Sequence, residues 1–187
     1  SASKKERNKT IRWVVTIFII TIIVSGVISF ASDIIMERSS IVVAFVILLI
    51  IVLLGIVFDV VGVAVTSADE KPFHSMAARK VPGSFEAIRL LRNAEQVSSI
   101  CNDVVGDICG VVSGSASATI AAQILMKFEF SWPQILSLLM SAFVAGLTVG
   151  GKAVGKTFAI NSSTKIVSNV GIIIYYLGHF KEIFKKK

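Results

Sequence analysis

The sequence contains few of the side chains that most often carry enzyme chemistry. Among its 187 residues are two cysteines, two histidines and 12 acidic residues, against 19 lysines and arginines. Cys101 and Cys109 lie in one predicted helix, about 12 Å apart along its axis, which is too far for a disulfide. His74 and His179 are isolated, and no Ser/His/Asp or Cys/His arrangement stands out. We therefore expect a protein that is not an enzyme and whose cysteines are small apolar residues.

Apolar side chains are what the sequence has in excess. Hydrophobic residues make up 54% of the chain, and its mean hydropathy is +0.80. A soluble domain of this composition would expose aggregation-prone patches. The formal net charge is +7, and the basic residues gather at helix flanks and chain ends, where an anionic membrane surface would attract them. No nucleic-acid recognition module is visible, so we expect the lipid bilayer as partner and no nucleic acid.

Four apolar runs reach the length of about 20 residues that a membrane-spanning helix needs. The sequence therefore predicts an all-α integral membrane protein with four transmembrane helices and amphipathic juxtamembrane helices. The apolar runs are 13–32, 41–58, 108–126 and 134–151. The predicted organisation is a basic N-terminus with an extra transmembrane helix (1–40), a three-helix core (41–160), and a C-terminal amphipathic helix with a basic tail (161–187).

The distribution of basic residues predicts the orientation in the membrane. With the N-terminus inside, the inner flanks carry 15 lysines and arginines, and the outer loops carry only Arg38 and Lys127. The positive-inside rule then predicts a multi-pass cell-membrane protein with both termini in the cytoplasm. The segment 69–97 mixes charged and apolar residues around Pro82-Gly83. It is too polar to span, so we predict a helical hairpin along the inner membrane surface.

Small residues recur at every fourth position of the third predicted helix and the residues just before its apolar run. Gly106, Gly110 and Gly114 are followed at the same spacing by Ala118 and Ala122. Small residues allow helix backbones to approach closely in lipid. We interpret these glycines as packing residues, either between helices of one chain or at the seam of a dimer.

Charged residues of three predicted helices fall at one depth in the membrane. Asp59, Asp107 and Lys152 each lie 18 or 19 residues from the outer end of their helix, which is roughly 27 Å at 1.5 Å per residue. Ionisable side chains are costly inside a bilayer, so such residues are functional candidates. Their alignment predicts a polar level near the inner membrane boundary.

Two interpretations of this polar level are open from the sequence alone. In the first, the membrane simply ends there, and the charges reach water or pair with one another. In the second, carboxylate and amide oxygens form a pocket for a hard cation such as Mg²⁺, with Lys152 as a counter-ion in the pocket. The ligands predicted by the second interpretation are Asp59, Asn102, Asp103 and Asp107, with Lys156 one turn further inward.

The string Gly150–Thr157 matches the P-loop pattern GxxxxGK[ST]. That motif works between a strand and a helix of a nucleotide-binding α/β domain. Here the string follows a spanning run, and only 30 residues come after it, too few for a parallel sheet. We therefore predict no ATP binding and no cofactor other than the cation considered above.

Four stretches of the sequence occur in an order that is typical of one family of membrane proteins. They are Phe58–Ser67, Ala87–Asn93, Ser99–Asp107 and Gly151–Thr157. Over roughly residues 41–185, the chain resembles the transmembrane domain of the CNNM/CorC (CorB) family of magnesium transporters. The resemblance implies a homodimer with three core helices per protomer, a juxtamembrane belt and an inward-open Mg²⁺ site. The first predicted helix would be an addition to that core.

The chain departs from this family at the residues that form the Mg²⁺ site. Asn102 and Lys156 match the family's motifs, and Lys152 stands where the family has a glutamate. Other motif positions hold Val61, Asp103, Gly106 and Gly155 in place of the family's serine, two asparagines and proline. The sequence also lacks the paired CBS domains, so we expect no nucleotide-linked regulation.

Two functions follow from the resemblance and its departures. The first is a divergent CNNM/CorC-like cation transporter, for Mg²⁺ or another divalent ion, with an inward-facing polar pocket. The alternative is a non-transporting membrane scaffold or regulatory subunit whose pocket is locked by Lys–Asp pairs. A transporter needs a pocket that water can reach, whereas a scaffold needs ion pairs that seal it.

Overall fold

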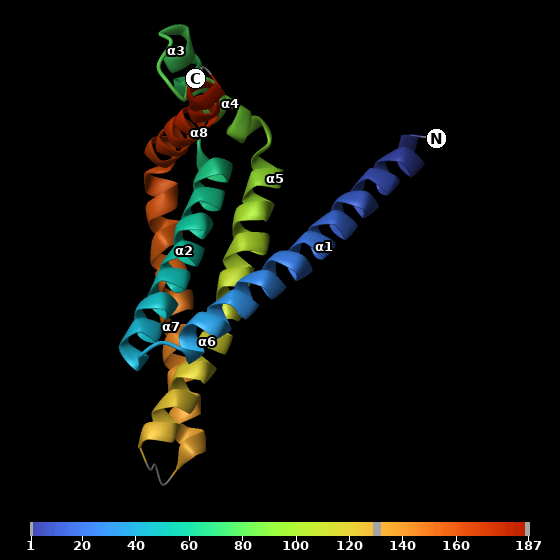
Figure 1. Cartoon of the computed structure of the whole chain (residues 1–187). Coiled ribbons are helices and arrows are strands. Elements are labelled where there is room, and N and C mark those ends of the chain that lie inside the picture. The colour runs from blue at the N-terminus through green and yellow to red at the C-terminus, as the bar shows by residue number, and fades with distance from the viewer. Residues whose placement is uncertain (1, 129–131, 186–187) are drawn as a thin grey trace. The chain divides into compact units, whose positions relative to one another are not determined.

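The structure is a computed structural model that describes residues 2–128 and 132–185. Every regular element within these residues is a helix (Figure 1), which confirms the predicted all-α class. The elements are α1 (Ala2–Glu37), α2 (Ile41–Ser67), α3 (Lys71–Ala78), α4 (Ser84–Arg92), α5 (Ala94–Ser99), the π-helix η1 (Ile100–Gly106), α6 (Asp107–Lys127), α7 (Pro133–Asn161) and α8 (Ser163–Lys185).

Four helical segments of the described chain are long and apolar enough to cross a membrane, as predicted. They are Thr10–Met36, Ile41–Ser67, Ala94–Lys127 and Pro133–Asn161. Val and Ile dominate α2, and both are mediocre helix formers in water. In a bilayer, however, every backbone polar group must be bonded within the segment, and a helix achieves this. The third segment begins well before the apolar run at 108, because the helix continues through charged residues that a run of apolar residues excludes.

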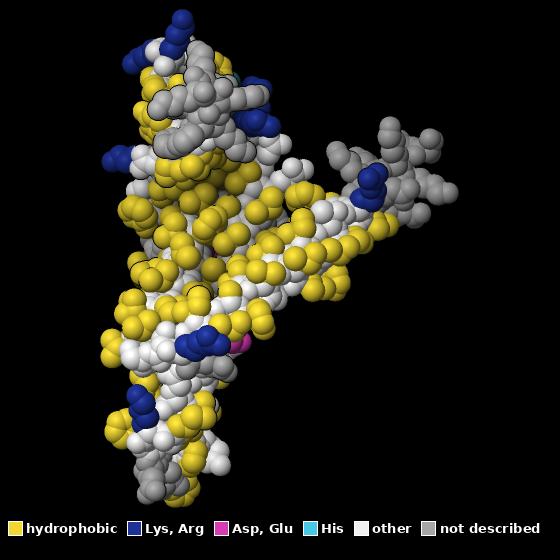
Figure 2. All heavy atoms as spheres, viewed as in Figure 1, with side chains coloured by type: hydrophobic (Ala, Val, Ile, Leu, Met, Phe, Trp, Pro, Cys, Tyr) yellow, Lys and Arg dark blue, Asp and Glu magenta, His cyan; other side chains and the backbone are white. Residues whose placement is uncertain are grey.

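The helices form two compact units, one made of residues 1–54 and 107–148 and the other of residues 55–106 and 149–187. In the first unit, α1 lies across α6 (Figure 1). The side-chain amide of Gln123 donates a hydrogen bond of 2.7 Å to the backbone carbonyl of Met36. Over residues 10–36, many large hydrophobic side chains of α1 are exposed (Figure 2), as expected for a helix that faces lipid.

The second unit has a small hydrophobic core where the ends of α2 and α7 meet the short helices. Its buried members are Ala64, Val65, Phe73, Ala87, Ile88, Ala159 and Val167. A polar contact joins α4 to the residue before α3, because Arg92 Nε donates to Glu70 Oε1 at 2.9 Å. This hydrogen bond lowers the pKa of the Glu70 carboxyl below its ordinary value. The segment predicted as a hairpin thus folds back on itself.

Two glycines allow α8 to lie against the turn that precedes α4. Gly83 has a φ of 81°, a backbone conformation that side chains disfavour. Gly171 of α8 faces it, so that a methyl group on Gly171 would collide with the carbonyl oxygen of Gly83. The same methyl group would lie 3.2 Å from the backbone nitrogen of Ala87. The approach of these backbones therefore depends on the absence of a side chain at Gly171.

We expect Gly171→Ala to destabilise the protein by about 1–3 kcal/mol, because backbone atoms must move to admit the methyl group. Gly178→Ala on the same helix is the matched control, since nothing among the described residues lies within 4 Å of its added methyl group. Alanine should even stabilise that position slightly, through its helix propensity. Thermal unfolding followed by circular dichroism measures both variants. Equal stability of the two would contradict the close backbone contact.

Candidate functional site

A cluster of three charges on α2 and α7 forms the polar centre of the second unit. The carboxylate of Asp59 on α2 is buried. The ammonium nitrogen of Lys152 lies 3.5 Å from Asp59 Oδ1, and that of Lys156 lies 3.8 Å from Asp59 Oδ2. Lys152 and Lys156 are four residues apart on α7, so both side chains leave the same face of that helix. We call these three residues the Asp59 cluster.

The two lysines differ in their access to solvent. The side chain of Lys152 is 20% exposed, whereas that of Lys156 is 54% exposed. Both distances to Asp59 exceed the roughly 2.7–2.9 Å of a charge-assisted hydrogen bond. Asp59 Oδ2 is buried and has no hydrogen-bond partner among the described residues. The lysines therefore neutralise the carboxylate without completing its hydrogen bonding.

Glycines on α7 bring the lysines within reach of Asp59. A methyl group on Gly151 would collide with Ile56 of α2, and one on Gly155 would lie 2.7 Å from Val60 Cγ2. Ile56 and Val60 flank Asp59 by one turn or less on either side, so these glycines set the separation of α2 and α7 at the cluster. This is the structural role of the string that resembles a P-loop. It lies inside α7, where the backbone N–H groups are used by the helix and are not free to cradle a phosphate.

Gly106 leaves room for the charge pair at the end of η1. A methyl group there would lie 3.2 Å from the ammonium nitrogen of Lys152 and 3.4 Å from Asp59 Oδ1. Predicted as a helix-packing residue, Gly106 is buried. What it accommodates is this pair of side-chain atoms.

Asn102 approaches α2 one turn along from Asp59. A methyl group on Gly62 would overlap the amide of Asn102. The amide nitrogen donates to Ser98 Oγ at 3.1 Å, and Oδ1 is buried with no hydrogen-bond partner in the described part of the chain. Asn102 lies in the π-helix η1, and the wider turn of a π-helix is often found at functional sites.

The other two predicted ligands are exposed. Asp103 Oδ2 accepts a hydrogen bond of 2.8 Å from Ser99 Oγ, and its side chain is exposed. Asp107 begins α6 in the first unit and is also exposed. Among the described side chains, those of residues 10–36, 38–128 and 132–178, no group of three or more His, Cys, Asp or Glu residues could hold a metal ion. The structure thus brings Asp59 together with the two lysines and places Asn102 beside the same helix.

Gly110 and Gly114 do not pack against another helix within the described chain. A methyl group on either would meet nothing within 4 Å. The face that α6 buries holds other residues, among them Val112, Ala116 and Ile120. Two packing roles were predicted for these glycines. The role at the seam of a dimer requires a second copy of the chain.

The sequence did not identify several residues that lie at or near buried polar groups. Ser98 orients Asn102, and Gly62 makes room for it. In the first unit, Asp33 Oδ1 and Gln123 Oε1 are buried without hydrogen-bond partners among the described residues. Asp33 could have been found as an ionisable residue inside a long helix, but the apolar run ended one residue before it. His74 contacts Glu70 at 3.0 Å, and the side chain of His179 lies outside the described part.

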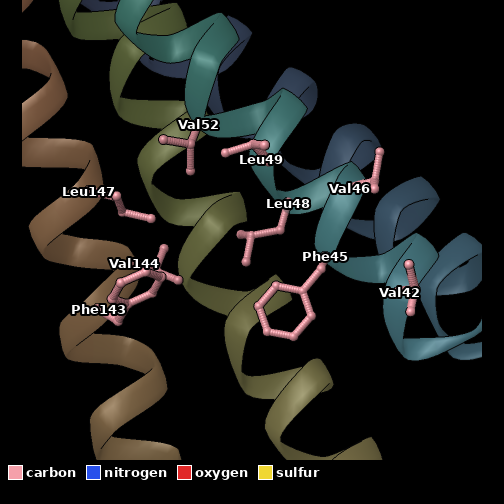
Figure 3. Close-up of a pocket in the computed structure, with 9 residues that line it drawn as sticks. All are labelled: Val42, Phe45, Val46, Leu48, Leu49, Val52, Phe143, Val144 and Leu147. Carbon is pink, nitrogen blue, oxygen red and sulfur yellow. The ribbon is translucent and has the colours of Figure 1, made fainter.

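A separate groove in the first unit is apolar. It has a volume of about 360 Å³ between α2 and α7, and no cation ligand lines it (Figure 3). Figure 3 shows the lining residues Val42, Phe45, Val46, Leu48, Leu49, Val52, Phe143, Val144 and Leu147. Such a lining suits lipid chains and not ions, so the Asp59 cluster remains the candidate site.

Comparison with known proteins finds no matching family model, no matching curated protein and no matching solved structure. The resemblance to the CNNM/CorC family therefore rests on the residues quoted from the sequence.

We expect Asp59→Asn to destabilise the protein by about 3–5 kcal/mol, because it leaves the mostly buried Lys152 ammonium without its counter-charge. The double variant Asp59→Asn with Lys152→Gln should recover much of this loss, which a double-mutant cycle measures as a coupling energy. Asp103→Asn is the control, because that carboxylate is exposed and should cost less than about 0.5 kcal/mol. Additive effects of the two substitutions would show that the pair is not coupled.

Proposed function

We propose that this chain is a divergent CNNM/CorC-like membrane cation transporter whose pocket at Asp59 is held by lysines when no cation is bound. The observation that carries this proposal is the Asp59 cluster, a buried carboxylate between two ammonium groups. Its depth on α2 is the level at which the family resemblance places a cation site. Both termini are proposed to lie in the cytoplasm, as the basic flanks predict.

Two unpartnered oxygens favour an exchangeable site over a purely structural ion cluster. In a structural cluster, buried oxygens are normally all hydrogen-bonded, because an unsatisfied buried group costs about 1–3 kcal/mol. Asp59 Oδ2 and Asn102 Oδ1 are both buried without a hydrogen-bond partner in the described chain. Carboxylate and amide oxygens are the ligands that hard cations prefer. We infer that a cation would use these two atoms.

The charge of the cluster determines how a cation could enter. One carboxylate and two ammonium groups give a net charge of +1, which repels a divalent ion. At 4 Å, each contact between an ammonium group and a divalent ion costs about 2–8 kcal/mol, depending on the local dielectric. A cation must therefore displace at least one lysine from Asp59. Lys156 is the side chain that can turn into solvent, since it is already 54% exposed.

A locked scaffold is the second candidate function. It is favoured by the burial of Asp59 and by the presence of two lysines where one would neutralise the carboxylate. In this case the lysines never leave, and the pocket only stabilises the contact between α2 and α7. The two functions differ in whether any cation competes with the lysines.

Thermal stability in matched-ionic-strength salts of Mg²⁺, Ca²⁺, Mn²⁺, Na⁺ and K⁺ separates the two functions. A cation that binds only the folded protein raises its stability by an amount that grows with concentration. We expect a saturable shift for one of these ions, with an affinity about tenfold higher in Lys152→Glu, because an opposing charge is removed. Lys165→Gln, which changes an exposed lysine of α8 outside the cluster, should leave the response unchanged.

Asp59→Asn should abolish the cation-dependent shift, which ties the response to the cluster. A flat response in every salt, in the wild-type protein and in Lys152→Glu alike, would reject the transporter and favour the locked scaffold.

We also propose that the chain forms a homodimer through the open small-residue face of α6. Gly114 is exposed, and a side chain there would meet nothing in the described chain, as expected for a residue that packs against a second helix in lipid. Gly114→Leu should then convert the dimer to a monomer, measured by size-exclusion chromatography with light scattering in detergent. Gly26→Leu on the exposed α1 is the control. A dimer that survives Gly114→Leu would rule out this seam.

A further inference from the structure

A second groove lies in the second unit, where α4 packs against α8 (Figure 1). It has a volume of about 250 Å³. Leu90, Val97 and Ile174 line it together with Glu86, Arg89 and Asn93. The surface of the groove is almost entirely apolar, and one acidic and one basic residue are among those that border it.

The two charges of this groove are not committed to other residues. Glu86 and Arg89 are three positions apart on α4, so they lie on neighbouring turns of one helix face. Within the described residues, neither side chain makes an ion pair or a side-chain hydrogen bond. Arg92 on the same helix is different, because its guanidinium is bound to Glu70 at 2.9 Å. Arg89 and Glu86 are thus available to an external partner of matching charge.

The residues around the groove are of the kinds that occur at the boundary between the membrane core and the headgroups. Val97 belongs to the third spanning segment, close to its start at Ala94. Tyr175 and Tyr176 directly follow Ile174 and pack edge to face, with ring centroids 5.6 Å apart. Tyrosine is enriched where membrane and water meet. Exposed apolar side chains nearby on α4 and α8, including Phe85 at 67% and Leu177 at 65% exposure, also suit contact with lipid.

We propose that this groove binds one bilayer phospholipid with a zwitterionic, amine-bearing headgroup of the ethanolamine type. Arg89 would bind the phosphate, Glu86 would accept hydrogen bonds from the primary ammonium, and an acyl chain would pack on Leu90, Val97 and Ile174. A headgroup with only negative charge offers no cation to Glu86, so its phosphate and the Glu86 carboxylate would repel each other. A choline headgroup offers a cation without N–H donors, so it would satisfy Glu86 less well.

The lipid site is independent of the proposed cation transport, because it shares no residue with the Asp59 cluster. The test uses the purified full chain in detergent micelles, to which phosphatidylethanolamine, phosphatidylcholine or phosphatidylglycerol of identical acyl chains is added at equal mole fraction. We expect phosphatidylethanolamine to raise the melting temperature most, since a ligand of the folded state stabilises it.

The variants separate the two halves of headgroup recognition. Arg89→Gln should weaken binding of phosphatidylethanolamine and phosphatidylcholine alike, by about tenfold, because both lose a charge-assisted contact to phosphate. Glu86→Gln should remove the preference for phosphatidylethanolamine over phosphatidylcholine. Arg92→Gln is the matched control: it breaks the pair with Glu70, and the increment from phosphatidylethanolamine should persist whatever its effect on the starting stability.

Three results would overturn the proposal. One is an equal rise in melting temperature with all three lipids, which would mean nonspecific solvation of the apolar surface. Another is a larger increment from phosphatidylglycerol, which means that the groove selects negative charge. The third is an increment from phosphatidylethanolamine that neither Arg89→Gln nor Glu86→Gln reduces, which places the lipid elsewhere.

Discussion

The pairing of Asp59 with Lys152 and Lys156 is the constraint on which the centre of the second unit depends. A carboxylate buried near the membrane core is costly without a counter-charge, and here the counter-charge comes from a different helix. The ammonium groups reach Asp59 only because α2 and α7 approach closely, and Gly151 and Gly155 permit this approach. The electrostatic requirement thus gives a reason for the glycines at positions 151 and 155 of α7.

The irregular stretch of the third spanning segment lies beside the same charges. Gly106 leaves space beside the Lys152 ammonium, and the π-helical turns before it bring the amide of Asn102 against Gly62. A regular α-helix would carry Asn102 at a different angle around the axis. The charge of Asp59 is therefore neutralised, while Asp59 Oδ2 and Asn102 Oδ1 have no hydrogen-bond partner among the described residues. In the proposed transporter, such a site would be stable without a cation and could still accept one.

Helix α4 of this unit has one buried face and one exposed face. α4 buries Ala87 and Ile88 in the core of the unit, while Arg89 and Arg92 remain exposed to reach polar partners. Arg92 forms an ion pair with Glu70, and Arg89 borders the groove beside α8. A lipid in that groove would contact α8 and the start of the third spanning segment together. The bilayer would then act as a specific ligand of the unit as well as its solvent.

The sequence by itself determined the all-α class, the four spanning segments and the common depth of Asp59 and Lys152. These follow from local rules, because a bilayer forces each apolar segment to bond its own backbone and a helix has a fixed rise per residue. Depth does not determine the direction in which a side chain points. Only the tertiary structure decided that Lys156 joins the cluster, that Asp103 and Asp107 are exposed, and that Gly110 and Gly114 face away from the other helices. Those outcomes depend on the rotation of each helix about its axis, which packing between helices and the π-helical turn set together.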